Sequence, residues 1–241
     1  MKKNKSLFIK RFYTYQKERF PFLGYIVLIG VFTFSAASYS RICRGEDGFI
    51  DWKNYLVGVI TTFSLFFLVR IFDEFKDKED DAKYRKYLPV PRGLISLKEL
   101  SVVGFCVAAI QLFIILFFQQ EMIFLYAVVM GYLLLMRVEF FIPEWLKKHQ
   151  LIYVVSHMFI IPIIDVYASG LDWFLEGVNA PVGLLFFFAV SFMNGIVLEF
   201  GRKIKSPEIE EDGVLSYTKY FGTKKAVWVW ISVLSTTLIL S

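Results

Sequence analysis

The sequence has few of the residues that usually build metal, redox or disulfide sites. Its 241 residues include only two cysteines and two histidines. Cys43 falls between two apolar runs and Cys106 lies inside another, so the two are not expected to pair, and no Cys-x-x-Cys motif occurs. Fingerprints for nucleotide, flavin and haem binding are also absent. The sequence therefore predicts neither a disulfide-stapled nor a nucleotide-dependent protein.

Apolar residues dominate the chain. Hydrophobic residues make up 56% of it and aromatic residues 19%, and the mean hydropathy is +0.54, well above that of soluble domains. These residues form continuous blocks of 15 to 19 rather than the spaced pattern of amphipathic surface helices. No internal repeat or low-complexity linker divides the chain. We therefore expect one transmembrane domain over residues 1–241, an all-α polytopic helical bundle in the lipid bilayer.

Seven of these blocks are candidate membrane-spanning helices. The fourth and the seventh are short for a hydrocarbon core of roughly 30 Å, so they are expected to tilt little, to use flanking residues or, for the seventh, to be cut off. The blocks cover residues 22–39, 55–72, 102–118, 122–136, 151–168, 182–200 and 226–240.

The distribution of lysine and arginine predicts how these helices are oriented. Of the 27 basic residues, 24 lie before the first helix and in the segments 70–98, 137–148 and 202–225. Two helices separate each of these segments from the next, so all four fall on one side of the membrane. An excess of basic residues marks the cytoplasmic side, and we expect the N-terminus and these loops there. The net charge of +5 then reflects topology and does not indicate nucleic-acid binding.

Acidic residues gather just after the second predicted helix. Asp73, Asp77 and Asp81 are four residues apart, so on a continuing helix consecutive carboxylates would lie about 40° apart around the axis, as one acidic stripe. Crowded carboxylates repel one another unless a divalent cation neutralises them, and Mg²⁺ typically binds through one or two carboxylates plus substrate phosphates. The alternative is a solvated loop in which neighbouring lysines neutralise the acids.

The stretch DEFKDKEDD at 73–81, followed by LPVPRGLIS at 88–96, resembles the first signature of the UbiA-type intramembrane prenyltransferases. The pattern of that family is N-D-x-x-D-x-x-x-D and then R-P-L-P-x-G-x-I-S. Asp73 stands at the Asn position, Glu74 at the next acid, and Asp77 and Asp81 at the last two acids. The residues that match the tail are Pro89, Pro91, Gly93, Ile95 and Ser96.

One residue of this signature departs from the family. Leu88 stands where the family has an arginine, so Arg85, Lys86 or Arg92 would have to supply that contact with diphosphate. The position of the signature agrees better: the family carries acidic signatures after its second and sixth helices, both on the cytoplasmic side. The chain has its two charged stretches after the second and sixth predicted helices. The family commonly has eight or nine helices, which is more than the seven expected here.

The second signature matches only in part. The family has D-x-x-x-D-x-x-x-D followed by G-x-x-T, whereas here Glu199 takes the place of the first acid and Lys203 that of the second. Either an acid of the loop completes the metal site, or the site holds fewer ions and Arg202 and Lys203 meet the phosphates directly. The alternative for Arg202 is a purely structural ion pair with Glu199. The remaining equivalents are Pro207 at the third acid and Gly213 and Ser216 in the tail, and the other acids available in the loop are Glu208, Glu210, Glu211 and Asp212.

The resemblance implies a role for each group of residues. Asp77, Asp81 and Glu199 would be catalytic, and with Asp73 they would hold Mg²⁺. The predicted diphosphate-binding residues are Arg85, Arg92, Arg202 and Lys203. Residues 137–150 read as an interfacial amphipathic stretch, and the resemblance implies that this loop helps to cap the active site.

A few polar residues lie inside the apolar blocks. His157 and Asp165 are eight residues apart on the fifth predicted helix and so within about 80° of each other around its axis. Ionisable residues at membrane depth usually face the protein interior. We expect these two residues and Asn194 either to line the acceptor pocket or to make hydrogen bonds between helices.

The resemblance implies Mg²⁺-dependent transfer of a prenyl group from a polyprenyl diphosphate to a hydrophobic acceptor. Loss of diphosphate needs metal ions and basic side chains, and the allylic cation needs a dry apolar cavity. One alternative is a terpene cyclase, in which the cation attacks its own double bonds. Another is a cation transporter or channel, which the position of the acids at the membrane surface disfavours. The D-x-x-D-G-x-x-A-R motif of CDP-alcohol phosphotransferases does not occur.

Overall fold

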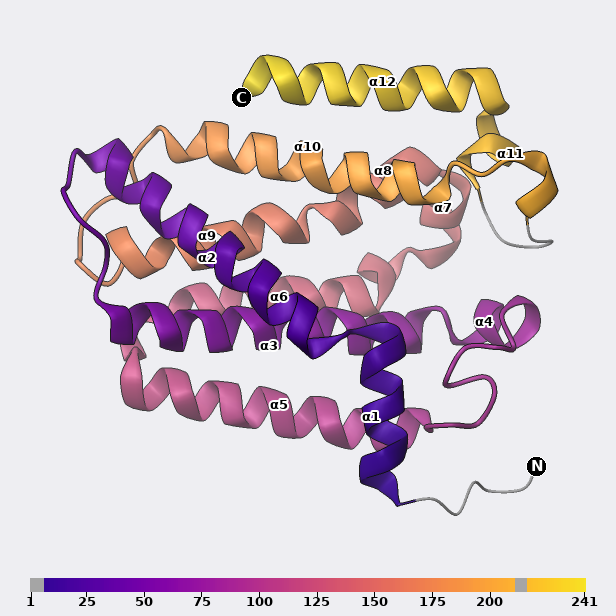
Figure 1. Cartoon of the computed structure of the whole chain (residues 1–241), viewed down its shortest axis with the longest axis horizontal. Coiled ribbons are helices and arrows are strands. Elements are labelled where there is room, and N and C mark those ends of the chain that lie inside the picture. Colours follow the sequence, from indigo (N-terminus) through magenta and orange to yellow (C-terminus); the bar gives the residue numbers. More distant parts are fainter. Residues whose placement is uncertain (1–6, 211–215) are drawn as a thin grey trace.

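The chain folds into a bundle of long helices (Figure 1). The structure is a computed structural model that describes residues 7–210 and 216–241, and every regular element in these ranges is a helix. Six helices of the described chain are long and apolar enough to cross a membrane, which confirms the predicted all-α polytopic architecture. They are α2 (Phe22–Arg44), α3 (Trp52–Lys76), α5 (Leu97–Phe118), the pair η1 (Gln120–Met122) and α6 (Ile123–Arg137), the pair α8 (Gln150–Met158) and α9 (Ile160–Trp173), and α10 (Leu184–Lys203).

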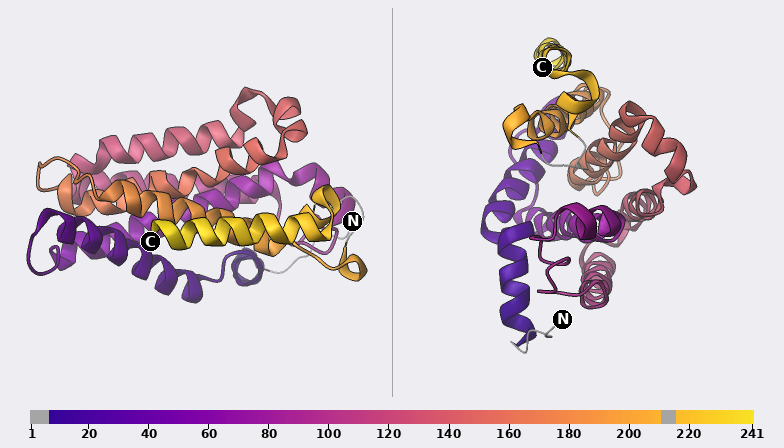
Figure 2. Two further views of the ribbon diagram at one scale, coloured as in Figure 1. Left: turned by 90° about the horizontal axis from the view of Figure 1, so that it is seen from above. Right: turned by 90° about the vertical axis from the view of Figure 1, so that its right-hand side faces the viewer.

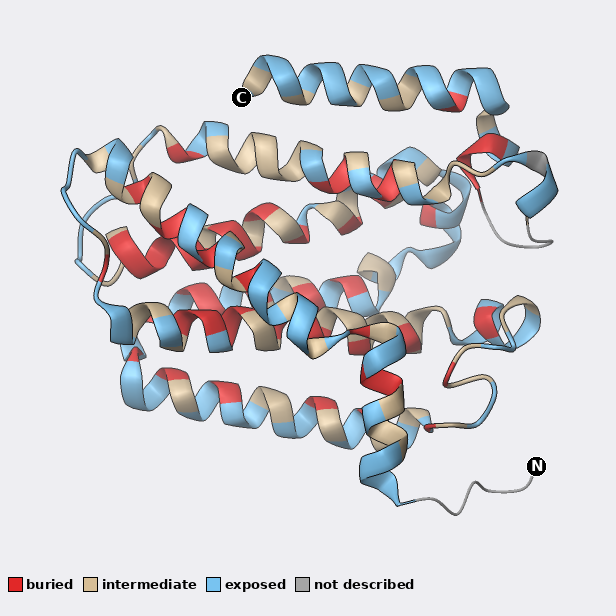
Figure 3. Cartoon of the chain, in the orientation of Figure 1, coloured by how far each residue is buried: buried red, intermediate tan, exposed pale blue. Residues whose placement is uncertain are grey.

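The outward faces of these helices are apolar. In α5, Phe105 and Phe117 are 76% and 70% exposed, and Leu198 of α10 is 72% exposed. Exposed and intermediate residues cover most of the outer ribbons, whereas buried residues concentrate between the helices (Figure 3). Large exposed apolar side chains are unfavourable in water and favourable against lipid, because helices that satisfy their own backbone hydrogen bonds can present such faces to hydrocarbon. The protein is therefore an integral membrane protein with several spans.

A further helix, α12 (Thr223–Leu240), forms where the seventh span is expected. It packs along the outside of α10 (Figure 2), and the indole Nε1 of Trp230 donates a hydrogen bond to the backbone oxygen of Val197 at 3.0 Å. Lys224 and Lys225 lie in its first turn, and α12 is not among the six helices that qualify as spans by length and composition.

Helix α9 lies at the centre of the bundle and packs against α2, α3, α6 and α10. Its close approach to α3 depends on Gly58, because a Cβ there would lie 2.2 Å from Cδ1 of Leu171. Small residues allow membrane helices to approach in this way. Helix α9 thus packs against α3, α6 and α10, the three helices that precede the charged loops.

The fifth predicted helix is broken in two. The sequence pattern predicts one helix over residues 151–168, but α8 ends at Met158 and α9 begins at Ile160. Pro162 explains the break, because a proline lacks the backbone N–H and its ring crowds the carbonyl four residues earlier, here that of Met158. His157 and Asp165 therefore lie on two consecutive helices of one span rather than on one uninterrupted helix.

An additional helix, α1 (Phe8–Arg19), precedes the first span and runs across the bundle (Figure 1). Ion pairs attach it to two spans: Arg11 contacts Glu99 of α5 at 2.6 Å, and Arg19 contacts Glu74 of α3 at 2.6 Å. Glu99 also completes a capping box with Ser96 at the start of α5. The N-terminal segment is thereby fixed to the end of the bundle that carries the charged loops.

The two ends of the bundle differ in charge. The described parts of the four basic segments lie at the end where α3 and α10 finish, whereas Arg41 and Arg44 lie at the opposite end. There both arginines pair with Asp172 of α9, at 3.2 and 2.8 Å, and Ser40 donates a hydrogen bond to the same carboxylate at 2.8 Å. The segregation agrees with the predicted topology. Which end faces the cytoplasm stays a prediction.

Candidate active site

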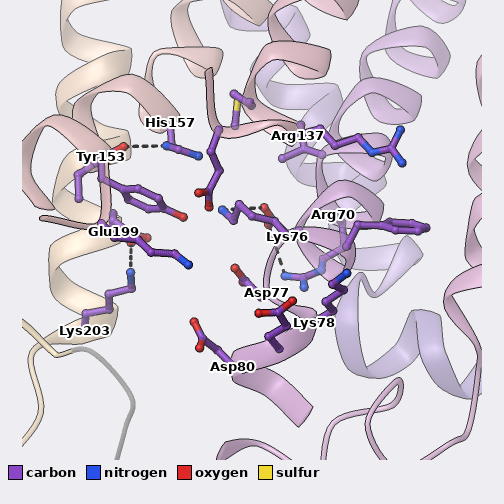
Figure 4. A pocket seen from close by; sticks show the side chains of 18 of the residues that line it. Arg70, Lys76, Asp77, Lys78, Asp80, Arg137, Tyr153, His157, Glu199 and Lys203 are labelled. Atoms are coloured by element: carbon purple, nitrogen blue, oxygen red, sulfur yellow. Dashed lines mark hydrogen bonds and ion pairs between the residues drawn. The ribbon is translucent and has the colours of Figure 1, made fainter. Parts of the chain in front are cut away.

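A cavity of about 760 Å³ opens at the charged end of the bundle. Its walls come from the ends of α3, α6, α8 and α10, and from the short helices α4 (Lys78–Tyr84) and α7 (Pro143–Lys148). Figure 4 shows side chains from the α3 region facing those from α8 and α10 across it. The two charged loops predicted from the sequence therefore meet in one site, together with the loop between α6 and α8.

Asp73 and Asp77 form part of the α3 wall of the cavity. Asp73 lies 3.7 Å from Arg70 and 3.5 Å from Lys76. Asp77 forms neither an ion pair nor a hydrogen bond through its side chain with the described residues. Burial raises the pKa of the Asp77 carboxyl, Lys76 lowers it and Asp73 raises it. Asp73 is thus neutralised by two cations, whereas burial raises the pKa of Asp77 more than the neighbouring cations lower it.

The predicted acidic stripe is interrupted at Asp77. Helix α3 ends at Lys76 and α4 begins at Lys78. Asp81 is 2% exposed, does not line the cavity and accepts a hydrogen bond from Nη1 of Arg85 at 3.0 Å. The three carboxylates do not lie on one face of one helix, because Asp81 turns toward Arg85.

The opposite wall is the end of α10. Glu199 is 6% exposed, and its two oxygens have different partners: Oε2 accepts a hydrogen bond from Nε of Arg202 at 2.6 Å, and Oε1 lies 2.7 Å from Nζ of Lys203. All three residues line the cavity. The structure therefore contains the ion pair between Glu199 and Arg202, and both basic groups also line the cavity.

The two arginines predicted to replace the missing family contact are placed differently. Arg85 lines the cavity while bonding to Asp81. Arg92 is not part of the cavity wall: it pairs with Glu18 of α1 at 2.7 Å and donates a hydrogen bond to the backbone oxygen of Tyr87. In this arrangement Arg92 joins the loop before α5 to the N-terminal helix.

Of the three predicted acceptor-pocket residues, only His157 lines the cavity. Its Nδ1 lies 2.8 Å from the backbone oxygen of Tyr153, and its ring stacks on that tyrosine with centroids 4.1 Å apart. A carbonyl oxygen only accepts hydrogen bonds, so this contact assigns the proton to Nδ1 and leaves Nε2 of a neutral ring as an acceptor. Nε2 is buried and has no hydrogen-bond partner.

Asp165 and Asn194 lie outside the cavity. Asp165 is completely buried; neither oxygen makes a well-formed hydrogen bond, and the Ser191 hydroxyl of α10 is the polar group that interacts with it. Asn194 is exposed on α10. An acceptor role for these two residues is therefore without support from their position.

Lys76 and Glu139 line the cavity but were not assigned to the site from the sequence, which predicts Lys76 only as one of the lysines that neutralise the neighbouring acids. Lys76 is 13% exposed, pairs with Asp73 and places its Nζ 5.4 Å from the centre of the Tyr153 ring. Its spacing of three residues from Asp73 is a signal that could have identified it, because residues three apart share a helix face. Glu139 also lines the cavity, and no motif of the sequence distinguishes it.

The remaining acids of the second loop do not reach the cavity. Glu210 accepts hydrogen bonds from Ser216 at 2.9 Å and from Thr218 at 2.5 Å, and these two bonds lower the pKa of its carboxyl. Neither Glu210 nor Glu208 lines the cavity. Glu211, Asp212 and Gly213 lie outside the described residues.

The fit of a divalent cation depends on how many carboxylates face the cavity. Within residues 7–210 and 216–241, no three His, Cys, Asp or Glu side chains are grouped closely enough to hold a metal ion by themselves. Mg²⁺ does not require such a cage, since it commonly uses one or two carboxylates with substrate phosphates and water. Asp77 lines the cavity without an ion pair and Asp73 lies one helical turn before it, so these residues fit an ion that arrives with a diphosphate.

These features define a multi-span membrane protein with a cavity that is lined by carboxylates and basic side chains and lies where charged loops leave the helical bundle. The sequence matches the UbiA prenyltransferase family over residues 29–241, which includes all of the cavity walls except Arg19. The chain belongs to this family of membrane prenyltransferases. Searches among curated proteins and among solved structures each gave no match.

Proposed function

We propose that the protein transfers a prenyl group, with the help of Mg²⁺, from a polyprenyl diphosphate to a hydrophobic acceptor within the membrane. The observation that supports this best is the meeting of two charged walls in one cavity. Asp73 and Asp77 lie at the end of α3, and Arg202 and Lys203 lie at the end of α10, on opposite sides of about 760 Å³.

Each wall suits one part of a metal-bound diphosphate. Asp77 and Asp73 would hold Mg²⁺, which when bound neutralises the charge that develops on the leaving diphosphate. Arg202 offers a planar fork that matches phosphate oxygens, and Lys203 offers a mobile point charge. Arg85 and Lys147 add two further cations to the lining. Together these groups stabilise diphosphate as the bond to the allylic carbon breaks.

Apolar residues also contribute to the lining of the cavity. Met136, Val154, Met158 and Ile160 contribute side chains to the same cavity. An apolar wall keeps water away from an allylic cation, which would otherwise be captured as an alcohol. The rings of Tyr153 and Phe75 also line the cavity, and aromatic faces stabilise cations.

His157 is the residue that we assign to the acceptor. The residue lines the cavity and its buried Nε2 has no hydrogen-bond partner, so Nε2 would accept the proton of an acceptor molecule as the new bond to carbon forms. His157→Ala should then lower turnover and weaken acceptor binding while leaving diphosphate binding unchanged. The variant His157→Gln, which keeps a hydrogen-bond acceptor but no base, separates binding of the acceptor from removal of its proton.

The test is release of diphosphate by the purified protein in lipid vesicles. Isoprenoid diphosphates of increasing chain length, supplied with Mg²⁺, should release diphosphate only when a suitable acceptor is present, and mass spectrometry of lipids that co-purify with the protein should identify that acceptor. Release together with a cyclic hydrocarbon and no acceptor would indicate a terpene cyclase. A cation flux through the vesicle membrane without any release of diphosphate would indicate a transporter or channel.

A further inference from the structure

The α10 wall of the cavity has no free carboxylate. The only acid that it contributes, Glu199, has a basic partner at each oxygen, Arg202 at one and Lys203 at the other. Lys203 stands where the family signature has its second acid. A metal ion facing Asp77 from this side would therefore lack a protein ligand on α10.

A carboxylate from a different part of the chain lies in this cavity. Glu139 follows α6 and begins the short helix η2 (Glu139–Phe141), and it lines the cavity together with Asp77. Its carboxylate forms neither an ion pair nor a hydrogen bond with the described residues. Lys147, Lys76 and Asp77 are among the charged groups that act on it, and all three line the same cavity. Glu139 and Asp77, both without a paired cation among the described residues, thus line one cavity, to which α4 adds Glu79 and Asp80.

The backbone that carries Glu139 has an uncommon conformation. Glu139, Phe140 and Phe141 have φ values of 47°, 54° and 63°. Residues with a Cβ avoid this left-handed region because the Cβ crowds the following carbonyl, and a run of three is rarer still. The Phe140 ring packs against the rings of Tyr132 and His157, with centroids 5.5 and 5.9 Å apart. Packing around Phe140 therefore holds a turn that delivers Glu139 to the cavity.

An independent feature of the cavity also indicates a polar ligand. His157 is only 3% exposed, yet its Nε2 has no hydrogen-bond partner and the residue lines the cavity. A buried polar atom without a partner is unfavourable unless something binds to it. His157 thus adds a buried acceptor atom to the wall that Asp77 and Glu139 also line.

We propose that Glu139 is a further carboxylate of the metal–diphosphate site, where it faces Asp77 and replaces the acid that the second signature has lost to Lys203. This rests on the proposed function, because the ion would bind together with a diphosphate. The loop between α6 and α7 would then contribute a charged ligand as well as a cover for the cavity.

The test uses Mn²⁺ as the probe and inorganic pyrophosphate as the diphosphate, with the full chain in detergent. Free Mn²⁺ is measured by electron paramagnetic resonance, which needs no turnover. Glu139→Gln should weaken Mn²⁺ binding in the presence of pyrophosphate by about ten- to a hundredfold. Glu139→Asn should do the same and keep or raise the unfolding temperature, because asparagine adopts the left-handed region more readily than glutamate. Glu144→Gln is the matched control: this acid lies five residues later, is exposed and does not line the cavity, so Mn²⁺ should bind as in the wild type.

The outcomes separate this proposal from the proposed function. If the wild type binds Mn²⁺ with pyrophosphate and both Glu139 variants bind it equally well, Glu139 is not part of the site, although the prenyltransferase assignment stands. Loss of folding in both variants would assign Glu139 to the fold and would also overturn the proposal. If the wild type itself does not bind Mn²⁺ with pyrophosphate, both the proposal and the proposed function fail.

Discussion

Arg202→Ala tests whether the basic end of α10 binds diphosphate or only neutralises Glu199. The Arg202 side chain is 65% exposed, whereas that of Glu199 is 7% exposed. After the substitution, Lys203 still lies 2.7 Å from Glu199, so the buried carboxylate keeps a cation. The substitution therefore removes a mobile, solvent-facing charge without leaving a buried charge unpaired.

The structure predicts very different magnitudes for stability and for binding. Exposed ion pairs contribute about 0–1 kcal/mol, so the free energy of unfolding should change little. A hydrogen bond between an arginine and a phosphate oxygen contributes about 1–3 kcal/mol, which corresponds to about a 5- to 150-fold weaker affinity for the diphosphate. Arg202→Lys should fall between the wild type and Arg202→Ala, because lysine keeps the charge and loses the planar fork.

The assay measures the affinity for pyrophosphate or the KM for an isoprenoid diphosphate, with thermal unfolding of each variant alongside. Lys224→Ala is the control for loss of one positive charge at the same end of the bundle, since this lysine is exposed and does not line the cavity. Normal binding of pyrophosphate by Arg202→Ala, or a failure of that variant to fold, would refute the phosphate role and leave Arg202 as a structural partner of Glu199.

Four further outcomes are expected. Asp77→Asn should abolish turnover while Asp73→Asn keeps activity, because the family itself has Asn at the position of Asp73; the reverse result in a turnover assay would show that the motif is aligned in the wrong register. Lys78→Cys, with Cys43 and Cys106 replaced, should resist an impermeant thiol reagent applied to intact cells, and labelling from outside would contradict the cytoplasmic placement of the cavity. Asp172→Ala should lower the free energy of unfolding by about 1–3 kcal/mol, measured by denaturant titration, because it removes the buried hydrogen-bond partner of Ser40, Arg41 and Arg44 while Glu176 still pairs with both arginines. Hydrogen bonds from Arg44 and Arg41 lower the pKa of Glu176. The stabilising effect of this carboxylate should therefore be complete above the unfolded-state pKa of about 4.3 and disappear as the pH falls through the lower folded value. In thermal unfolding, Glu176→Gln should reduce this loss of stability at acid pH, and an unchanged pH dependence would contradict the pairing.

Much of the fold was predictable because membrane helices are specified by composition. A helix that crosses a bilayer needs a continuous apolar block, so the positions of α2, α3, α5, α6 and α10 follow directly from the sequence. The break between α8 and α9 was not predicted, although its cause is visible in the sequence. The apolar block at 151–168 predicts one helix, but Pro162 within it interrupts the helical hydrogen bonds.

The site was predictable only where its residues belong to a pattern. Asp73 and Asp77 stood out because acids at spacings of four share a helix face, and the structure places both in the cavity. Asp81 follows the same spacing but bonds to Arg85, and Arg92 bonds to Glu18, which is 74 residues away in sequence. Such choices among ion-pair partners depend on three-dimensional packing, and spacing along the chain does not determine them.

Glu139 is the clearest example of a cavity residue that the sequence does not predict. It belongs to no signature, it lies in a stretch that reads as an interfacial anchor, and its side chain reaches the cavity because three residues without glycine adopt positive φ. A propensity argument would assign the opposite conformation to each of them. Where several consecutive residues adopt an unfavourable backbone conformation, packing must offset its free-energy cost, and such segments are often functional.

The location of the cavity follows from the same physics as the topology. Basic residues are retained on one side of the membrane, and every second loop lies on that side, so the loops after α3, α6 and α10 all meet at one end of the bundle. Charged groups at that end can remain hydrated, while the helices below them must be apolar. A cavity at this boundary therefore combines cations and carboxylates for a diphosphate with a dry wall for its hydrocarbon chain. A bilayer substrate with a charged head and an apolar tail would enter such a site in the orientation that it already has in the membrane.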